Sequence, residues 1–183
     1  MIDQNIANIL TQLRENNNPK KELNHIYVDS ENIVVTDTRI LIVHKHNMDI
    51  KDDFLLLNQK CKINMDFNIE DGFMEFGVDV YRKKILLREK PKTGNGYFYN
   101  YPDYKRIIPK IDSKKFSHHL KGVDALYTLT SQNGVVLDYV KFATLFRKLD
   151  KIRFDRYYFS EKNMPIAIEN DNLMIVLMPL VIG

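Results

Sequence analysis

The chain has 183 residues, of which 44% are hydrophobic and 28% are charged, and its formal net charge is +3. This composition supports an ordinary globular core, and the length allows one domain or a small two-part body. No apolar run approaches the ~20 residues that span a bilayer and the N-terminus lacks the layout of a signal peptide, so we expect a soluble, cytoplasmic protein without a membrane partner. The single cysteine, Cys61, excludes an internal disulfide framework and a multi-cysteine zinc site.

The N-terminal segment has the pattern of an amphipathic helix. Ile6, Ile9, Leu10 and Leu13 recur at spacings of three and four, and the Asn-Asn-Asn-Pro run that ends at Pro19 breaks the pattern. We therefore predict a helix over residues 2–14. The following chain alternates or runs in β-rich bursts, which predict strands over residues 25–28, 33–36, 39–44, 73–80, 84–88 and 123–129.

A second helix is predicted over residues 138–149, after a turn at Asn133-Gly134. Asp138 is a suitable N-cap, and an apolar stripe follows on one face: Tyr139, Phe142, Ala143, Phe146 and Leu149. Three further strands are predicted over residues 152–159, 165–168 and 173–178. A helix followed by three strands therefore occurs twice in the chain.

Three short motifs carry a resemblance to a known family. They are Val34-Val-Thr-Asp-Thr-Arg-Ile-Leu-Ile-Val43, Tyr101-Pro-Asp-Tyr-Lys-Arg-Ile-Ile-Pro109 and Leu173-Met-Ile-Val-Leu-Met-Pro-Leu-Val181. In this order they are similar to the Ala-Thr-Asp-Gly-His-Arg-Leu-Ala strand, the Pro-Asp-Tyr-Arg-Arg-like run and the final Met-Pro-Met-Arg-like strand of bacterial sliding clamps, the beta subunits of DNA polymerase III. The Gly-His pair of the family is reduced here to the single Thr38.

The resemblance implies an α+β, clamp-like fold of repeated helix-plus-strands units, with a mostly antiparallel sheet and two main helices. A bacterial clamp has three such domains and two chains close its ring, so this chain is shorter than a complete clamp subunit. Two arrangements stay open: one domain with residues 50–122 inserted between its halves, or a first domain followed by an abbreviated second. We treat residues 1–183 as a single clamp-like body, with 1–109 and 110–183 as its alternative division at the Pro-Asp-Tyr junction.

In the family the three motifs converge on one hydrophobic cleft that receives short peptides of polymerases, loaders and repair factors. Carried over by position, the cleft comprises Thr36, Arg39, Ile40, Pro102, Arg106, Ile107, Met178, Pro179 and Leu180. Apolar walls suit Leu or Phe anchors, methionine adapts to varied shapes, and an arginine orients a carbonyl or an acidic group. The alternative is that these residues belong to the core of strands. The chain also ends in Leu-Val-Ile-Gly183 where the family has Met-Arg-Leu, so a rim charge is lost.

Positive charge is concentrated in the middle of the chain. Residues 81–121 hold twelve Lys and Arg against three carboxylates, which leaves a net charge of −6 for the rest. Such a field attracts phosphate backbones without sequence specificity. If a ring forms, the cations expected to face DNA lie on and just after the second helix: Lys141, Arg147, Lys148 and Lys151. The alternative for both groups of cations is an ordinary solvated surface.

Catalytic and metal-binding patterns are weak. The chain has no glycine-rich phosphate loop, no nucleophile elbow and no acidic pair with an evident partner, so neither an enzyme nor a cofactor is expected. His44 and His46 would lie on one face of a strand, but a metal site needs a third ligand. The pair His118-His119 is interpreted as a loop.

An aromatic cluster next to cations permits a different function. Base stacking on single-stranded nucleic acid would use Tyr97, Phe98, Tyr99, Tyr101 and Tyr104, with Lys105 and Arg106 beside them. The alternative is strand packing, with Gly94-Asn-Gly96 as the turn.

We therefore predict a noncatalytic sliding-clamp-like protein of DNA replication or repair. It acts either as an oligomeric processivity ring or as a module that binds clamp-binding peptides. The expected partners are DNA, without sequence specificity, replication or repair proteins with such peptides, and further copies of the chain if a ring forms. A basic, aromatic single-stranded nucleic-acid-binding protein without clamp activity is the alternative.

Overall fold

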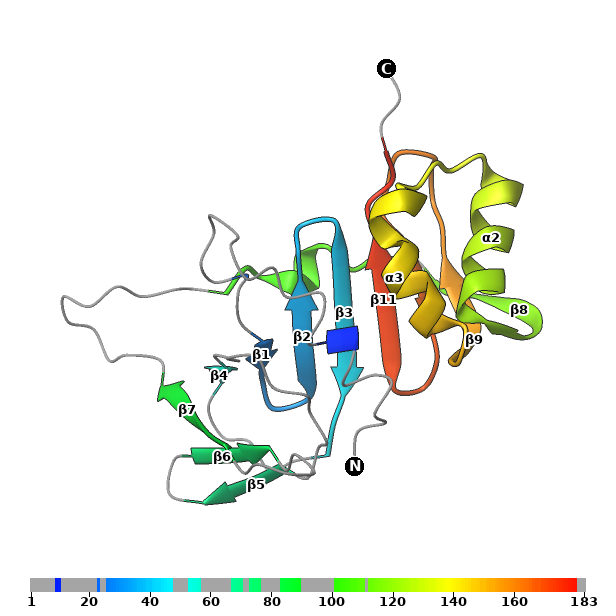
Figure 1. Cartoon of the computed structure of the whole chain (residues 1–183). Helices are drawn as coiled ribbons and strands as arrows, with labels where there is room; N and C mark the ends of the chain where they lie inside the picture. Colours follow the sequence, from blue (N-terminus) through cyan, green and yellow to red (C-terminus); the bar gives the residue numbers. More distant parts are fainter. Residues whose placement is uncertain are drawn as a thin grey trace. The chain divides into compact units, whose positions relative to one another are not determined.

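The structure is a computed structural model that describes residues 9–10, 23, 26–47, 53–56, 67–70, 73–76, 83–89, 101–110 and 112–180 (Figure 1). The chain forms two compact units. The first comprises Met1–Thr38 and Val43–Pro102, and the second comprises Arg39–Ile42 and Asp103–Gly183. The Pro-Asp-Tyr motif spans their boundary, because Pro102 belongs to the first unit and Asp103 to the second. Whether the chain acts as one body or divides at residues 109 and 110 stays a prediction.

The first unit is built from antiparallel strands. Its strands are β1 (Ile26–Val28), β2 (Asn32–Thr36), β4 (Phe54–Leu56), β5 (Phe67–Glu70), β6 (Phe73–Phe76), β7 (Lys83–Glu89) and the end of β3 (Ile40–Lys45). They lie in the order β5-β6-β7-β4-β1-β2-β3. All five residues of β2 are buried, as expected for the β-branched run Ile33-Val34-Val35. Of the predicted N-terminal helix the structure describes Ile9 and Leu10, which are helical and buried.

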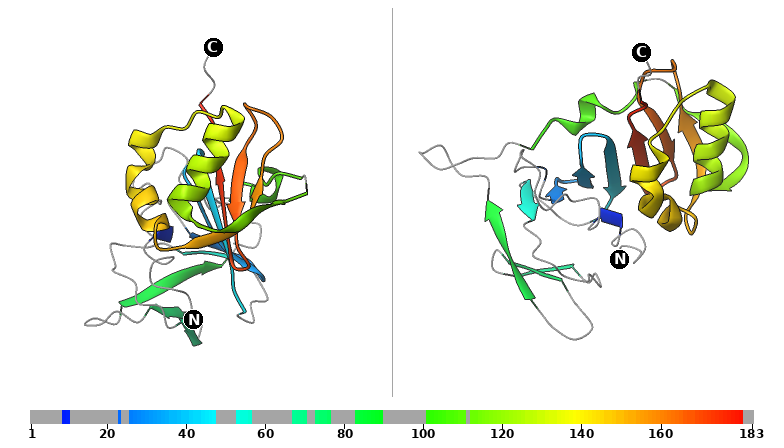
Figure 2. Two further views of the ribbon diagram at one scale, coloured as in Figure 1. Left: turned by 90° about the vertical axis from the view of Figure 1, so that its right-hand side faces the viewer. Right: turned by 45° about the horizontal axis from the view of Figure 1, so that its top comes forward.

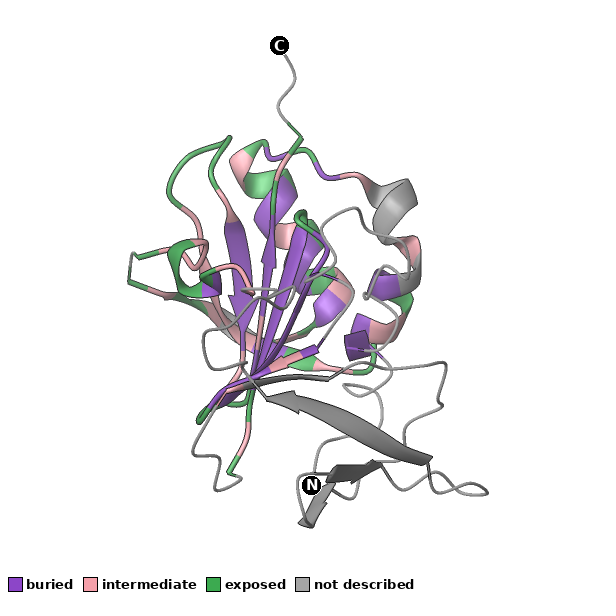
Figure 3. Ribbon diagram, turned by 90° about the vertical axis from the view of Figure 1, so that its left-hand side faces the viewer, coloured by how far each residue is buried: buried purple, intermediate pink, exposed green. Residues whose placement is uncertain are grey.

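The second unit packs two helices against an antiparallel sheet. The start of β3 neighbours β11 (Leu173–Leu177), and the order continues with β10 (Ile166–Glu169), β9 (Arg153–Tyr158) and β8 (Lys114–Lys121). Helix α2 (Gly122–Asn133) packs on β8, β9, β10 and on α3 (Tyr139–Leu149), as Figures 1 and 2 show. A short 3-10 helix, η2, spans Tyr104–Arg106. The buried residues run along the central strands (Figure 3), and the core includes Leu126, Leu129, Leu149, Phe154, Ile166, Ile168 and Ile175.

Most predicted elements are confirmed. The antiparallel α+β fold class, the helix after Asp138 and the strands at residues 25–28, 33–36, 39–44, 84–88, 152–159, 165–168 and 173–178 all appear, with shifts of a residue or two at their ends. The strand predicted over residues 73–80 is present at Phe73–Phe76, and its remainder lies outside the described residues. The second helix followed by three strands is the order observed for α3, β9, β10 and β11.

Two local predictions are wrong. Residues 123–129, predicted as a strand, form most of α2, whose buried side chains Ala125, Leu126, Leu129 and Thr130 recur at spacings of three and four. The β-forming Val123, Tyr127 and Thr128 obscured this period. The Asn133-Gly134 pair ends α2, since Gly134 adopts a left-handed conformation with φ 63° and donates to the Thr130 carbonyl. The predicted loop at His118-His119 lies within β8.

Gly122 fixes how closely α2 approaches the end of α3. A Cβ atom at this position would lie 2.6 Å from the Leu149 Cβ and 2.7 Å from the Leu149 carbonyl oxygen. The Gly122 amide donates to the Ile152 carbonyl at 2.9 Å. Only glycine fits without a shift of the backbone, so this residue sets the contact between the two helices.

Candidate functional site

The first and third sequence motifs meet in the second unit. Strand β3 neighbours β11, and beyond β11 the Met178 amide donates to the Arg39 carbonyl at 2.8 Å. Two residues later the Leu180 amide donates to the Val136 carbonyl at 2.9 Å, which adds the α2–α3 loop to the same place. The resemblance predicted that all three motifs converge on one cleft. A backbone hydrogen bond joins the first and the third, and the convergence of the second motif with them stays a prediction.

Apolar side chains are exposed along this junction. Val136, Met178 and Leu180 are each 36% exposed, and Pro179 between the last two is half-buried. We call Val136, Met178, Pro179 and Leu180 the apolar junction. Backbone hydrogen bonds already hold these segments in place, so little conformational entropy is lost when apolar ligand groups pack on their exposed side chains.

An ion pair borders the apolar junction. The Arg39 guanidinium lies 3.9 Å from the Asp138 carboxylate, which immediately precedes α3. A carboxylate at this position also interacts favourably with the helix N-terminus. Both side chains are partly exposed, so the pair contributes less than about 1 kcal/mol to stability, and Arg39 can exchange this partner for a ligand group at small cost. Sequence reasoning missed Val136 and Asp138 as site residues because they follow no family motif.

The second motif is anchored at both of its tyrosines. Tyr104 is 4% exposed, and the Ile107 amide donates to its carbonyl at 3.0 Å. The predicted cleft residue Arg106 pairs with Asp103 at 3.0 Å, within its own turn, and Ile107 is half-buried. The motif is therefore an ordered turn in which Arg106 is exposed.

Tyr101, in the first unit, has its own anchors. Its ring stacks on Tyr27 at a centroid distance of 4.8 Å, and Tyr27 donates to the Asp53 carboxylate at 2.6 Å. Burial raises the pKa of Tyr101 strongly. The stacked Tyr101 and the buried Tyr104 leave little open ring face for nucleic-acid bases, and Tyr97, Phe98 and Tyr99 lie outside the described residues.

The predicted cleft residues are divided between the two units. Thr36 and Pro102 belong to the first unit and the other seven to the second. Thr36 is buried, and its Oγ1 accepts from the Thr38 amide at 3.2 Å. Ile40 is only 1% exposed, so it supports the junction from the core of the sheet. Its role in a peptide cleft, like that of the other eight residues, stays a prediction.

Thr38 holds the turn before Arg39 in an unusual conformation. Its φ is 78°, the left-handed region that β-branched residues rarely adopt. Glycine adopts this conformation readily, whereas a residue with a branched Cβ is strained in it. Strain of this kind costs about 1–3 kcal/mol and tends to occur beside functional sites.

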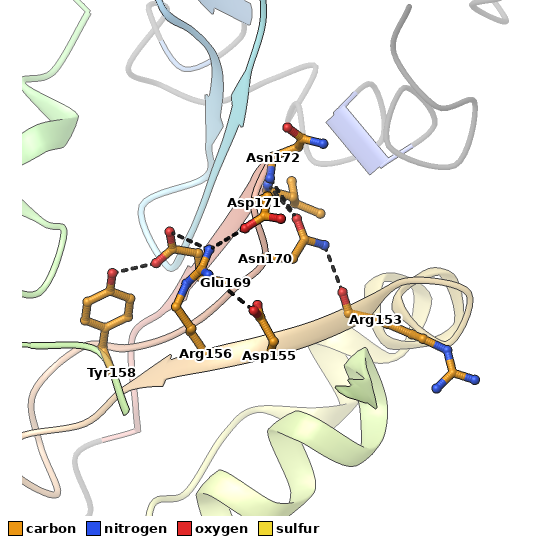
Figure 4. Close-up of polar contacts among 9 residues, drawn as sticks. Arg153, Asp155, Arg156, Tyr158, Glu169, Asn170, Asp171 and Asn172 are labelled. Carbon is orange, nitrogen blue, oxygen red and sulfur yellow. Dashed lines mark hydrogen bonds and ion pairs between the residues drawn. The ribbon is translucent and has the colours of Figure 1, made fainter. Parts of the chain in front are cut away.

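A polar network on β9 and β10 went unnoticed in the sequence (Figure 4). Arg156 lies 3.2 Å from Asp155, 3.5 Å from Glu169 and 3.2 Å from Asp171, and Tyr158 donates to Glu169 at 2.5 Å. Burial lowers the pKa of Arg156, but the hydrogen bond to Asp171 and the three carboxylates outweigh burial and raise it. Burial and the bond to Glu169 raise the pKa of Tyr158. Because β9 pairs with β10 here, the network locks the two strands together.

Three of the four cations predicted to face DNA lie around the end of α3. Arg147 and Lys151 are exposed, and Lys148 is half-buried with its pKa lowered by burial. The side chain of Lys141 lies outside the described part of the structure. A role in DNA contact stays a prediction for all four.

The described residues show neither a metal-binding cluster nor a membrane-spanning helix. Among them, no three His, Cys, Asp or Glu side chains are grouped so as to hold a metal ion. His44 is buried in β3, and a ring nitrogen of His46 lies 2.8 Å from the Asp29 carbonyl. Within the same ranges, no helix has the length and apolar character needed to cross a bilayer.

The fold is similar to that of solved sliding clamps. The beta clamp of Helicobacter pylori bound to a DNA ligase peptide has a TM-score of 0.58 at 15% identity, over 98% of this chain and 63% of that chain. The DNA polymerase III beta subunit of Thermotoga maritima gives 0.55 at 12% identity, over 100% and 65%. The Bacillus subtilis clamp gives 0.58 at 12% identity, over 98% and 62%. The chain has a clamp-like fold.

The similarity has defined limits. At 12–15% identity it establishes the fold alone, and the chain spans 62–65% of the length of these three clamps. No protein-family model and no curated protein sequence matches the chain.

Proposed function

We propose that the chain is a noncatalytic, sliding-clamp-like protein of DNA replication or repair that binds short linear peptides at the apolar junction. The observation that carries the proposal is the hydrogen bond from the Met178 amide to the Arg39 carbonyl, which brings two motifs together beside exposed Val136, Met178 and Leu180. One of the structurally similar clamps was solved with a DNA ligase peptide bound. Replication or repair proteins with such peptides are the proposed partners, in the cytoplasm.

The chemistry of the junction defines the expected ligand. Leucine or phenylalanine side chains would pack on Met178 and Leu180, and the adaptable Met178 accommodates anchors of different shapes. Arg39 would turn from Asp138 to a backbone carbonyl or an acidic group of the peptide. Because apolar packing dominates, affinity depends little on salt, in contrast to DNA binding.

Two modes of action are compatible with this surface. As an oligomeric ring the protein would encircle DNA and tether its partners, and as a single module it would capture the same peptides without encircling DNA. A closed ring forms only if a whole number of rotations from one copy to the next adds up to a full turn.

Peptide binding can be tested with a matched pair of methionine variants. Fluorescence anisotropy would measure a labelled peptide with a Leu-Phe pair and the same peptide with Ala-Ala. Met178→Glu places a charge in the junction, whereas Met164→Glu places one at a loop residue that is 50% exposed. We expect the wild type and Met164→Glu to bind the Leu-Phe peptide equally, and Met178→Glu to bind it at least tenfold more weakly. Equal affinity of both variants, or equal affinity for both peptides, would contradict the proposal.

A further inference from the structure

One ion pair carries the charge of the segments that form the apolar junction. These segments are residues 39–42, 134–138 and 176–180, all of them in the second unit. Their ionisable side chains are Arg39 and Asp138. The two charges cancel while the groups lie 3.9 Å apart. Within these segments, a charged group of a bound peptide can be recognised only through this pair.

Backbone hydrogen bonds place both charged residues beside the exposed apolar side chains. The Arg39 carbonyl accepts from the Met178 amide at 2.8 Å, and the Val136 carbonyl accepts from the Leu180 amide at 2.9 Å. Asp138 follows Val136 by two residues. A peptide whose apolar anchors pack on Met178 and Leu180 therefore brings its neighbouring residues to the ion pair.

The two members of the pair respond differently to a ligand. Arg39 is long and its side chain is 49% exposed, so it keeps contact with water or a carbonyl group when it turns away from Asp138. Asp138 is short, lies immediately before α3 and is 32% exposed. When Arg39 turns to a peptide carbonyl, this mostly covered carboxylate loses a counter-charge, which costs free energy. A cation of the peptide would replace that counter-charge.

An acidic peptide group meets the opposite situation. A carboxylate that takes Arg39 as its partner comes to lie close to Asp138, because the pair is only 3.9 Å apart. Like charges at such a distance disfavour binding. The Asp138 carboxylate therefore attracts a cationic neighbour of the apolar anchors and repels an anionic one, and selective sites typically combine these two effects.

We propose that Asp138 is a specificity-determining residue that selects peptides with a lysine or arginine next to their apolar anchors. This inference rests on the proposed function, since it needs a peptide at the apolar junction, and it defines the class of peptide more narrowly. Apolar packing supplies most of the affinity, and the charge at Asp138 decides between peptides with the same anchors.

The test compares three labelled peptides by fluorescence anisotropy. Each contains the Leu-Phe pair, and the residue next to the pair is lysine, glutamine or glutamate, placed before the pair in one series and after it in a second. In the series whose position reaches the ion pair, the lysine peptide should bind the wild type about threefold more tightly than the glutamine peptide, and the glutamate peptide about threefold more weakly. Added salt should bring the three affinities together.

Matched variants assign the preference to one carboxylate. Asp138→Asn removes the charge and keeps a side chain that suits a helix N-terminus. Because Arg39 then carries the remaining charge, the order should reverse and the glutamate peptide should bind most tightly. Arg39→Gln should keep the preference for lysine. The control is Asp150→Asn, which removes a carboxylate paired with Lys121 just beyond the other end of α3 and should leave the order as in the wild type. Circular dichroism would verify that the variants are folded.

The outcomes separate this inference from peptide binding itself. Equal affinity of the wild type for the three peptides, tighter binding of the glutamate peptide, or a lysine preference that survives Asp138→Asn would overturn the role of Asp138 and leave the proposed function in place. Absence of binding of every peptide to the wild type would overturn both. An equal change of order in Asp150→Asn would show a diffuse effect of net charge and overturn the assignment to Asp138.

Discussion

Replacing Gly122 by alanine tests the packing of α2 against the end of α3 within the second unit. The new methyl group would lie 2.6 Å from the Leu149 Cβ and 3.0 Å from Phe154, whereas carbon atoms in contact are about 3.5–4.0 Å apart. Leu149 and Phe154 are fully buried, and the Leu149 carbonyl oxygen at 2.7 Å is backbone, so no flexible side chain can move aside. Overpacking of this kind costs about 1–3 kcal/mol, and the helix propensity of alanine offsets up to about 1 kcal/mol. We expect a net loss of about 1–2 kcal/mol.

Urea denaturation followed by circular dichroism measures this loss, and Gly134→Ala is the matched control. Position 134 has open space around it, so alanine there costs only the left-handed conformation at φ 63°, about 1 kcal/mol. Gly134→Asn should recover most of that cost, because asparagine tolerates this conformation, but Gly122→Asn should be worse than Gly122→Ala. A Gly122→Ala protein as stable as the wild type would refute the close approach of α2 to the end of α3.

Four further outcomes are expected. Thr38→Gly should raise stability by about 1 kcal/mol in urea denaturation, because φ 78° suits glycine, and a loss would contradict the strain. Arg156→Met should lose about 2 kcal/mol in the same assay, since it removes the ion-pair partner of the buried Glu169, and an unchanged midpoint would show that the network contributes little. Burial raises the folded-state pKa of Tyr101 above its unfolded value near 10. The contribution of neutral Tyr101 to the free energy of unfolding is therefore fully present below pH 10 and is lost as pH rises further. The loss of stability at alkaline pH should be smaller in Tyr101→Phe. Light scattering on a size-exclusion column should give one mass at all protein concentrations. A multiple of the chain mass of 21.6 kDa would support a ring. The mass of a single chain would exclude an autonomous ring and leave the single peptide-binding module.

Local sequence signals predicted elements where periodicity and capping agree. Helix α3 was predicted because Asp138 precedes a regular apolar stripe, and β11 because it is a run of large apolar residues. Helix α2 was missed because its β-branched and aromatic residues favour a strand locally, while packing on β8, β9 and β10 decides for a helix. Strand β8 was missed because its lysines and histidines are typical of a solvated segment. Lysines of this kind are common on strands at the edge of a sheet, where β8 lies.

The candidate site was predictable only in part. The resemblance indicated that the segments around Arg39 and Met178 converge, and the Met178–Arg39 hydrogen bond agrees. Val136 joins the same place through a hydrogen bond between residues 44 positions apart, and a long-range contact of this kind leaves no local pattern. Burial is likewise decided by the folded chain, which puts Ile40 in the core and leaves Met178 exposed.

The central claim, that peptides bind at the apolar junction, is most directly tested by methionine methyl NMR. Protein labelled with ¹³C at the methionine methyl groups would be titrated with the Leu-Phe peptide, and Met178→Leu and Met164→Leu would assign the two signals by their disappearance. The account predicts that the Met178 signal shifts with saturation while the exposed Met164 signal stays in place. Saturable binding that leaves the Met178 signal unmoved, or that shifts Met164 instead, would contradict it.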